Sequence, residues 1–151
     1  MTARDVEHLL YRYAEAIDAG DFGAVGELFR HGRIYAAAES PDTGPITVAE
    51  GAEAVTELYR SLVIVYDDGT PRTRHLVSNA IIDVDEGLGS ATGRSSYTVF
   101  QGSSDDSPAL QPIVIGRYED TFHRIGGTWW FASGTMHVDL TGDLSRHLRV
   151  S

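Results

Sequence analysis

An aspartate and a histidine are the residues of this sequence that are best suited to acid–base chemistry. Asp18 stands at the end of an apolar pattern typical of a helix, and His75 lies within an alternating pattern typical of a strand. A carboxylate that accepts a hydrogen bond from one imidazole nitrogen fixes the tautomer of the ring. It also stabilises the imidazolium that forms when the other nitrogen takes a proton. A histidine supported in this way is a general base, a role that typically raises a rate by about 10²–10⁴-fold.

Each of the two residues also has a purely structural interpretation. Asp18 opens the segment Asp-Ala-Gly-Asp, residues 18–21, where an aspartate commonly stabilises a helix end or a turn. A single histidine in a strand is more often structural than catalytic. The strand pattern places four side chains of mixed polarity on the face of His75: Thr73, Val77, Asn79 and Ile81. Such a mixture favours the wall of a pocket over a packed core.

Several aromatic side chains and one arginine are candidates for contacts with a substrate. Tyr13 lies at the centre of the apolar helical stripe, and its hydroxyl could bind a carbonyl or leaving oxygen. A buried tyrosine that packs its ring is the simpler interpretation. Arg117 could bind the same oxygen if its side chain points inward, and Asp120 is an alternative carboxylate on the sheet. The other candidates for the pocket wall are Tyr59, Tyr97, Trp129 and Phe131.

The sequence lacks the motifs of several other chemistries. It contains no cysteine, which excludes disulfides, thiolate metal sites and a cysteine nucleophile. No His-x-His or HExxH spacing occurs, and the pair His137 and Asp139 alone is poor evidence for a metal. A phosphate loop, a GxGxxG fingerprint and a GxSxG elbow are also missing. We therefore expect no metal and no cofactor.

Length and charge restrict the class of protein. With 151 residues and 42% hydrophobic residues, the chain is long enough for one domain with a substantial core. Its formal net charge of −10 repels phosphate groups, so we expect neither nucleic acid nor an anionic membrane as a partner. No long apolar run is present, and the charged N-terminus does not resemble a secretory signal. We therefore expect a cytoplasmic location.

The N-terminal part of the sequence has helical patterns. A first helix is expected from a start signal at Thr2 and Asp5 to Gly20, and Asp21 should cap a short second helix. Residues 33–37 could form a short strand, followed by a loop over 38–46. Thr47 with Glu50 fits a second start signal, for a helix that carries the apolar positions Val55, Leu58, Tyr59 and Leu62.

The remainder of the sequence alternates with a period of two and predicts four long strands. We expect strands over 72–85, from the Glu86-Gly87 turn through Phe100, over 111–124 and over 128–138, with a loop over 102–109. Gly126-Gly127 between two alternating runs is a strong hairpin signal. The polar tail from Asp139 should be partly ordered at best.

Helices followed by a meander of long strands predict a single α+β domain over 1–151, with a core of about 3–140 and a tail of 141–151. Long strands must twist and coil, so the antiparallel sheet should curve strongly around the N-terminal helices and form a cone with an apolar pocket. The second face of the sheet carries Leu76, Ala80 and Ile82 and would remain uncovered. We therefore expect a homodimer or homotrimer.

Three stretches of the sequence resemble the SnoaL-like branch of the nuclear transport factor 2-like superfamily. They are Tyr11–Phe22, Thr73–Asn79 and Gly116–Phe131, and their order and spacing cover roughly residues 3–145. The superfamily includes scytalone dehydratase, hexachlorocyclohexane dehydrochlorinase, bile-acid 7α-dehydratase, steroid Δ-isomerase and polyketide cyclases. It also includes the small subunits of ring-hydroxylating dioxygenases and simple binding modules. The resemblance therefore implies the cone-shaped fold without naming a reaction.

The resemblance also implies roles for particular residues. The dehydratase and dehydrochlorinase members use an aspartate at the end of the first helix with a histidine on the sheet, and Asp18 and His75 match these positions. The bile-acid enzyme adds a tyrosine in the same helix, which Tyr13 matches. The scytalone enzyme has a tyrosine immediately before its aspartate, where this chain has Ile17. This departure argues against the same full mechanism.

Our functional hypothesis is a dehydratase, cyclase or isomerase that needs no cofactor. Asp18 and His75 would abstract a proton next to an activating group of a small, largely apolar substrate, such as a polycyclic, polyketide-like or steroid-like compound. The first alternative is a non-catalytic binding or accessory subunit, because dioxygenase small subunits share the Arg-His-Leu-Val-x-Asn type of strand found at 74–79. A cyclase that works through Asp120 is the second alternative.

Overall fold

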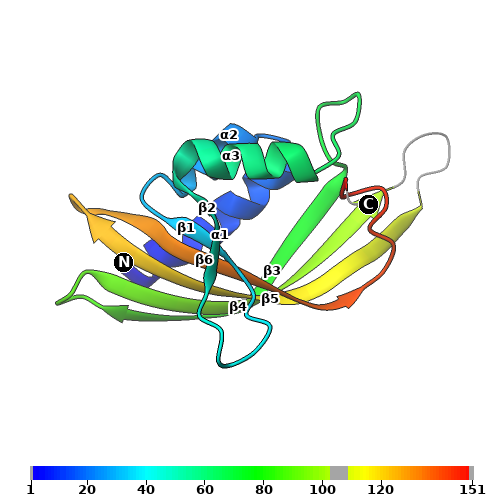
Figure 1. Cartoon of the computed structure of the whole chain (residues 1–151). Coiled ribbons are helices and arrows are strands. Elements are labelled where there is room, and N and C mark those ends of the chain that lie inside the picture. Colours follow the sequence, from blue (N-terminus) through cyan, green and yellow to red (C-terminus); the bar gives the residue numbers. More distant parts are fainter. Residues whose placement is uncertain (1, 103–108, 150–151) are drawn as a thin grey trace.

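The computed structural model describes residues 2–102 and 109–149. In this part of the chain, three helices lie on one face of a curved six-stranded sheet (Figure 1). Two of the helices precede the first strand in the sequence. The fold is therefore the predicted α+β class. No helix among the described residues is long and apolar enough to cross a membrane.

The first two helices form as predicted, and the capping signal of the second is confirmed. Helix α1 (Thr2–Asp18) buries Val6, Leu10 and Ile17 on its apolar stripe. Gly20 ends it with a φ of 74°, and a Cβ at this position would lie 2.1 Å from the carbonyl oxygen of Gly69. Only glycine fits this left-handed turn and close approach. Helix α2 (Phe22–Leu28) then starts at Asp21, whose side chain accepts a 3.0 Å hydrogen bond from the backbone nitrogen of Ala24.

The expected third helix starts later than its sequence signal. Strand β1 (Arg33–Ala36) was expected, but residues 46–50 form strand β2 (Ile46–Glu50), and helix α3 (Gly51–Leu62) follows. The prediction of a helix start at Thr47 was wrong because Thr47 pairs with Tyr35 of β1 in an antiparallel ladder. Glu50 makes no capping hydrogen bond through its side chain and instead pairs with Arg33 at 2.8 Å.

Four long strands follow as a meander. They are β3 (Thr73–Asp85), β4 (Ser90–Gly102), β5 (Leu110–Ile125) and β6 (Thr128–Thr141). The sheet order is β2-β1-β6-β5-β4-β3, and only the contact between β1 and β6 is parallel. Gly126 and Gly127 form the predicted turn with φ values of 57° and 83°. Residues 103–108 of the predicted loop lie outside the described residues.

A bulge in β3 changes which side chains face the helices. Pairing with β4 shifts between Ser78 and Ile81, and Asn79 has a φ of 55°. Before the bulge, Val77 packs against the core; after it, Ala80 and Ile82 do so. Asn79 and Ile81 therefore lie on the outer face, and the expectation that they share the face of His75 was wrong. A bulge reverses the alternation of faces because it inserts one additional residue.

The C-terminal segment is ordered in the structure, contrary to the expectation for a tail from Asp139. Strand β6 continues to Thr141, and residues 142–149 then fold back to the helices. The backbone nitrogen of Gly142 donates to Ile113 at 2.8 Å, that of Ile64 donates to His147 at 2.8 Å, and that of Arg149 donates to Leu62 at 2.7 Å. The segment ends near the first residues of β3 (Figure 1). Backbone hydrogen bonds that sequence patterns do not encode hold it there.

The outer face of the sheet carries an apolar row that no helix covers. Register pairs Leu76 with Thr98, Thr98 with Ile115, and Ile115 with Leu140, across four strands. Leu76, Ile115 and Leu140 are 49%, 41% and 68% exposed. We propose that a second copy of the chain covers this row, because exposed apolar rows on a sheet commonly mark contacts between proteins.

We expect light scattering at micromolar concentration to give the mass of a dimer or trimer. Ile115→Arg should shift the mass toward that of one chain, because it places a charge in the middle of the row. Leu88→Arg is the matched control, since Leu88 is 79% exposed at the hairpin between β3 and β4, away from the row. A monomer at this concentration for the unmodified chain would exclude the proposed contact.

Candidate functional site

The Asp18 carboxylate joins the end of α1 to the start of β3. One oxygen accepts hydrogen bonds from the Thr73 hydroxyl at 2.9 Å and from Nδ1 of His75 at 2.6 Å. The other oxygen accepts from the backbone nitrogen of His75 at 2.8 Å. The side chains of His75 and Asp18 are only 8% and 12% exposed. The two residues therefore lie within hydrogen-bond distance, as the sequence analysis predicted.

This arrangement determines the tautomer of His75. A carboxylate can only accept hydrogen bonds, so Nδ1 of His75 must carry a hydrogen. In the neutral ring the lone pair is then on Nε2, which has no hydrogen-bond partner among the described residues. Asp18 and His75 line a groove of 610 Å³ between α1 and β3, which also contacts Tyr11, Glu15 and Arg74. His75 is consequently oriented to accept a proton on Nε2.

A second group of polar side chains lies on the same, concave side of the sheet. The hydroxyls of Tyr13 and Tyr59 share a short hydrogen bond. The Tyr13 ring packs edge-on against Tyr118, with centroids 5.8 Å apart, and Tyr118 stacks on Tyr97 at 4.3 Å. Burial raises the pKa of Tyr13 well above its usual value and the pKa of Tyr59 to about 12. Both phenols remain protonated at neutral pH and can donate hydrogen bonds.

Asp120 adds a carboxylic acid to this group. It lies on the inner phase of β5 between Tyr118 and Phe122, and it is 7% exposed. Its Oδ1 lies beside Gly134, and no described residue donates a hydrogen bond to it. Burial, and then the nearby charge of Glu119, raise the pKa of Asp120 well above its usual value. The raised pKa favours the protonated form of Asp120, which can donate a proton or a hydrogen bond.

From the sequence, Asp120 was only an alternative candidate, although a signal for it exists. In the alternating run 118–122, an acidic residue occupies the inward phase that is otherwise aromatic. A carboxyl group at such a position must be neutral or paired, because burial of an unpaired charge is costly. That rule identifies Asp120 as a residue with a perturbed environment, which is a common property of functional sites.

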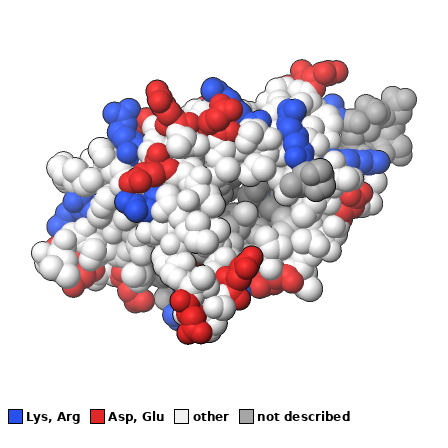
Figure 2. Space-filling view, in the orientation of Figure 1, with Lys and Arg blue, Asp and Glu red and all other residues white. Residues whose placement is uncertain are grey.

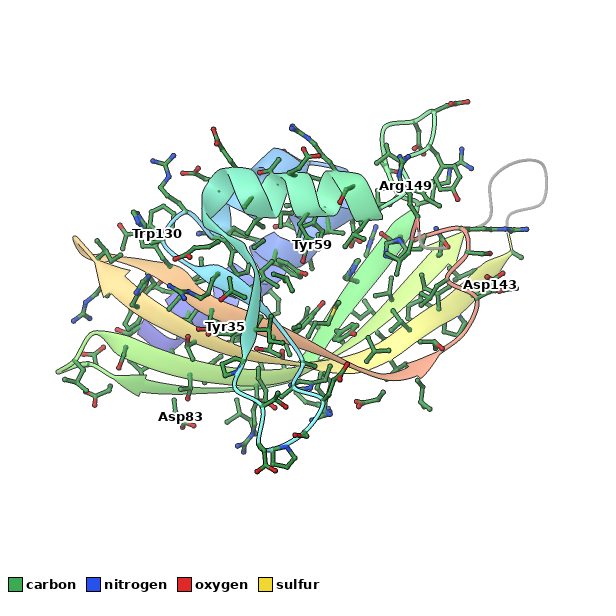
Figure 3. The ribbon with its side chains drawn as sticks, viewed as in Figure 1. Tyr35, Tyr59, Asp83, Trp130, Asp143 and Arg149 are labelled. Carbon is green, nitrogen blue, oxygen red and sulfur yellow. The ribbon has the colours of Figure 1, made fainter. Side chains whose placement is uncertain are left out.

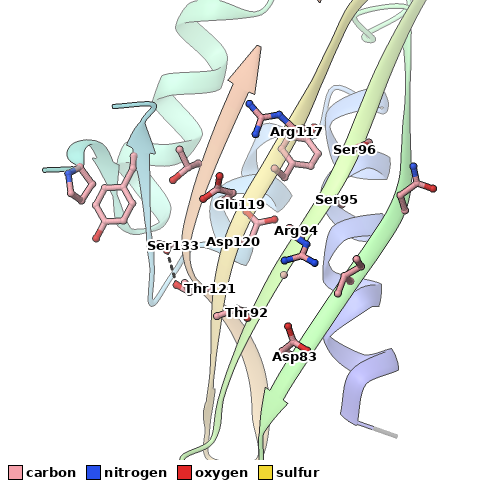
Figure 4. Close-up of a pocket in the computed structure, with 17 residues that line it drawn as sticks. Asp83, Thr92, Arg94, Ser95, Ser96, Arg117, Glu119, Asp120, Thr121 and Ser133 are labelled. Carbon is pink, nitrogen blue, oxygen red and sulfur yellow. Dashed lines mark hydrogen bonds between the residues drawn. The ribbon is translucent and has the colours of Figure 1, made fainter. Parts of the chain in front are cut away.

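Arg117 does not contribute to the concave side, so the inward orientation considered for it was wrong. Strand alternation places Arg117 on the outer face, where it bonds Asp139 at 3.0 Å and 3.1 Å. There it lines a pocket of 730 Å³ with Arg94, Glu119 and Thr121 (Figure 4). Its neighbour Tyr118 takes the inward position instead.

The other predicted wall residues are buried on the concave side. Tyr97 is 1% exposed and donates a 3.3 Å hydrogen bond to the carbonyl of His137, while Trp129 and Phe131 belong to the apolar core. Tyr59 extends from α3 toward the sheet (Figure 3). No cluster of three or more histidine, aspartate or glutamate residues that could hold a metal occurs within 2–102 and 109–149.

The concave side is open beneath α3. Met136 and Val138 pair with the buried residues Tyr118 and Gly116, yet they are 47% and 50% exposed. The molecular surface is hollowed in this region (Figure 2). An opening here would admit a small molecule to the side of the sheet that carries the tyrosines and Asp120.

A family model for the SnoaL-like domain matches residues 2–135, which is most of the chain. The chain belongs to the SnoaL-like domain family. This confirms the resemblance stated from the sequence. No curated protein matches the sequence closely enough to count as a relative.

Solved structures that are similar to this SnoaL-like domain confirm the fold. Three of them are from Novosphingobium aromaticivorans. A nuclear transport factor 2-like protein with a cystatin-like fold has 19% identity, a TM-score of 0.66 and coverage of 95% of this chain and 84% of its own. A protein provisionally named scytalone dehydratase has 19% identity, a TM-score of 0.63 and coverage of 93% and 85%. The beta subunit of a provisionally named aromatic-ring-hydroxylating dioxygenase has 21% identity, a TM-score of 0.67 and coverage of 93% and 91%. At these identities the likeness shows the fold alone.

The state of Asp120 can be tested through stability. The unfolded chain releases this proton above about pH 4, whereas the folded chain retains it, so the parent loses stability as the pH rises from there. We expect Asp120→Asn to be more stable than the parent at pH 7.5 and to lose this advantage near pH 4.5. The maximum difference in slope is about 1.4 kcal/mol per pH unit, one proton. Urea unfolding at both pH values checks this, and identical pH profiles would contradict a neutral Asp120.

Proposed function

We propose that this SnoaL-like domain is a cofactor-independent enzyme of the lyase or isomerase type, a dehydratase or cyclase. The observation that carries the proposal is the Asp18 carboxylate, which binds Nδ1 of His75 at 2.6 Å and leaves Nε2 to act as a base. Membership of the SnoaL-like family supports the same class of activity. The expected substrate is small and largely apolar, such as a polycyclic, polyketide-like or steroid-like ketone.

The chemistry begins with transfer of a proton from carbon to His75. Nε2 forms the new N–H bond, and the electron pair of the broken C–H bond moves into the substrate, toward the carbonyl oxygen. Asp18 stabilises the imidazolium, because its charge is already hydrogen-bonded to the other ring nitrogen. The enolate then expels a leaving hydroxyl, shifts its double bond or attacks a second carbon. In the first case, the proton on His75 leaves with the hydroxyl as water.

Hydrogen-bond donors for the substrate oxygen that becomes negative would come from Tyr13, Tyr59 and Asp120. Tyr13 and Tyr59 share one hydrogen bond, so the second hydroxyl hydrogen of this pair remains available to a substrate. Asp120 is a further donor as a neutral acid. Donors that are fixed before the reaction stabilise the developing charge without a cost of reorientation.

An accessory subunit without catalysis is the second candidate function. The similarity to the dioxygenase beta subunit favours it, since both chains have the same fold over most of their lengths. Under this alternative, Asp18 only anchors α1 to β3, and the pair has no substrate proton to remove.

Hydrogen exchange separates the two functions. We expect candidate hydroxylated polycyclic ketones to exchange a hydrogen next to the carbonyl in deuterated buffer, or to lose water, as measured by mass spectrometry. His75→Ala should lower this rate by about 10²–10⁴-fold, because the base is lost. Asp18→Asn should also lower it strongly, because the imidazolium loses its counter-charge. His8→Ala is the control, since His8 is an exposed histidine of α1.

An accessory subunit would show binding of such ketones without exchange, and its affinity would change only modestly in these variants. Exchange that persists in His75→Ala would exclude this histidine as the base and would favour Asp120. Melting temperatures should change little in His75→Ala, because the Thr73 hydroxyl and the backbone nitrogen of residue 75 still donate to Asp18.

The paired hydroxyls of Tyr13 and Tyr59, here called the phenol pair, lead to a separate prediction for the same assay. Tyr59→Phe should lower kcat with a smaller change in KM, by about 10-fold or more, because the lost donor acts mainly on the charge of the transition state. Tyr35→Phe is the matched control, since Tyr35 lies on β1 and lines the pocket on the outer face, away from the Tyr13–Tyr59 pair. Equal losses in both variants would show that the effect comes from the fold.

A further inference from the structure

A second histidine lies beside the Asp18–His75 pair. His147, on the C-terminal segment 142–149, is 7% exposed, and its ring centroid is 6.4 Å from that of His75, with the planes at 63°. The three residues come from α1, β3 and this segment. No sequence pattern pointed to His147, because the tail was expected to be partly ordered at best.

The backbone and not the imidazole fixes the position of His147. Its carbonyl accepts from the backbone nitrogen of Ile64 at 2.8 Å, and its own nitrogen donates to Leu144 at 3.0 Å. The preceding carbonyl, of Arg146, accepts from the Gln101 side chain at 3.0 Å. The segment therefore remains attached whatever side chain stands at position 147, and the imidazole is free for another use.

The imidazole of His147 has an unused polar atom. Nδ1 is buried and has no hydrogen-bond partner among the described residues. A buried polar atom without a partner is destabilising, and in native proteins it commonly marks a place that a ligand or water occupies. Burial, and then the neighbouring His75, lower the pKa of His147 to about 4, against a smaller opposing effect of Asp18. The ring is consequently neutral at pH 7, with one donor and one acceptor nitrogen.

The spacing of the two rings fits a single oxygen atom between them. An oxygen that forms two hydrogen bonds of about 2.8 Å can join nitrogens up to about 5.6 Å apart. Each ring nitrogen lies off its centroid, so centroids 6.4 Å apart allow nitrogens that face each other to lie within this limit. The two rings form no direct hydrogen bond with each other.

We propose that His147 and His75 together bind one hydroxyl oxygen of the substrate, so that the ligand is a hydroxylated ketone and the hydroxyl is held beside the base. This inference deepens the proposed function and relies on it for the identity of the base. It favours elimination of water over a simple double-bond shift, because the hydroxyl then lies next to the histidine that carries the abstracted proton.

A pair of polycyclic ketones that differ by one hydroxyl tests the inference by binding, without turnover. We expect the unmodified chain to bind the hydroxylated ketone at least about 10-fold more tightly, which corresponds to one net hydrogen bond. His147→Phe should abolish this preference, because it fills the space without a polar atom. His147→Gln should retain part of it. Calorimetry gives the affinities, and nitrogen-15 NMR of the imidazoles should show that His147 and His75 both respond only to the hydroxylated ketone.

The outcomes separate this inference from the proposed function. If His147→Phe loses the preference for the hydroxylated ketone and the parent shows exchange that depends on His75, both the hydroxyl site and the proposed function are supported. Preference that persists in His147→Phe overturns the hydroxyl site, even if His75→Ala abolishes exchange. Loss of preference without any exchange in the parent supports the hydroxyl site and excludes the enzyme. A change in melting temperature of His147→Phe but not of His147→Gln would identify misfolding, and His147→Leu, which also lacks a polar side-chain atom, would then replace the phenylalanine variant in the test.

Discussion

The hydrogen bonds between the Asp18 carboxylate and β3 are the interaction on which the site depends. Asp18 is the last residue of α1, where the helix dipole disfavours a negative charge. Hydrogen bonds from Thr73 and His75 offset this effect. The same bonds fix the end of the helix against the edge strand of the sheet. Structural and chemical roles therefore coincide, because the group that anchors the helix also orients the imidazole.

The two buried aspartates of the concave side show how surroundings decide the state of one residue type. Asp18 accepts three hydrogen bonds and acts as a counter-charge, whereas Asp120 has none from the described residues and lies between aromatic side chains. Burial, and then the charge of Glu119, raise the pKa of Asp120 well above its usual value, which favours its protonated form. Two carboxyl groups in such different surroundings could serve the proposed reaction in different roles at one pH.

Sequence patterns predicted most helices and strands of this fold, but not every strand pairing or the face on which each side chain lies. The stripe of α1, the Asp21 cap and the Gly126-Gly127 turn depend on local chemistry, and the structure confirms them. The pair Asp18 and His75 was also predicted, from its placement and the family resemblance. Strand β2 was missed because pairing with β1 overrides a local helix signal. Partners that are distant in sequence decide such features, as they also decide the bulge at Asn79 and the course of residues 142–149.

The candidate site residues fall into two parts of the chain. The family model covers residues 2–135, and this region includes the Asp18–His75 pair, both phenols and Asp120. His147 lies beyond it, on a segment held by backbone hydrogen bonds to Leu62, Ile64 and Ile113. Such bonds tolerate changes of side chain, so the segment can alter what it presents to the base while the fold is preserved. Under the proposed function, the groups that would perform the chemistry are therefore built into the sheet and helices, whereas the C-terminal segment beside them would add a group that selects the substrate.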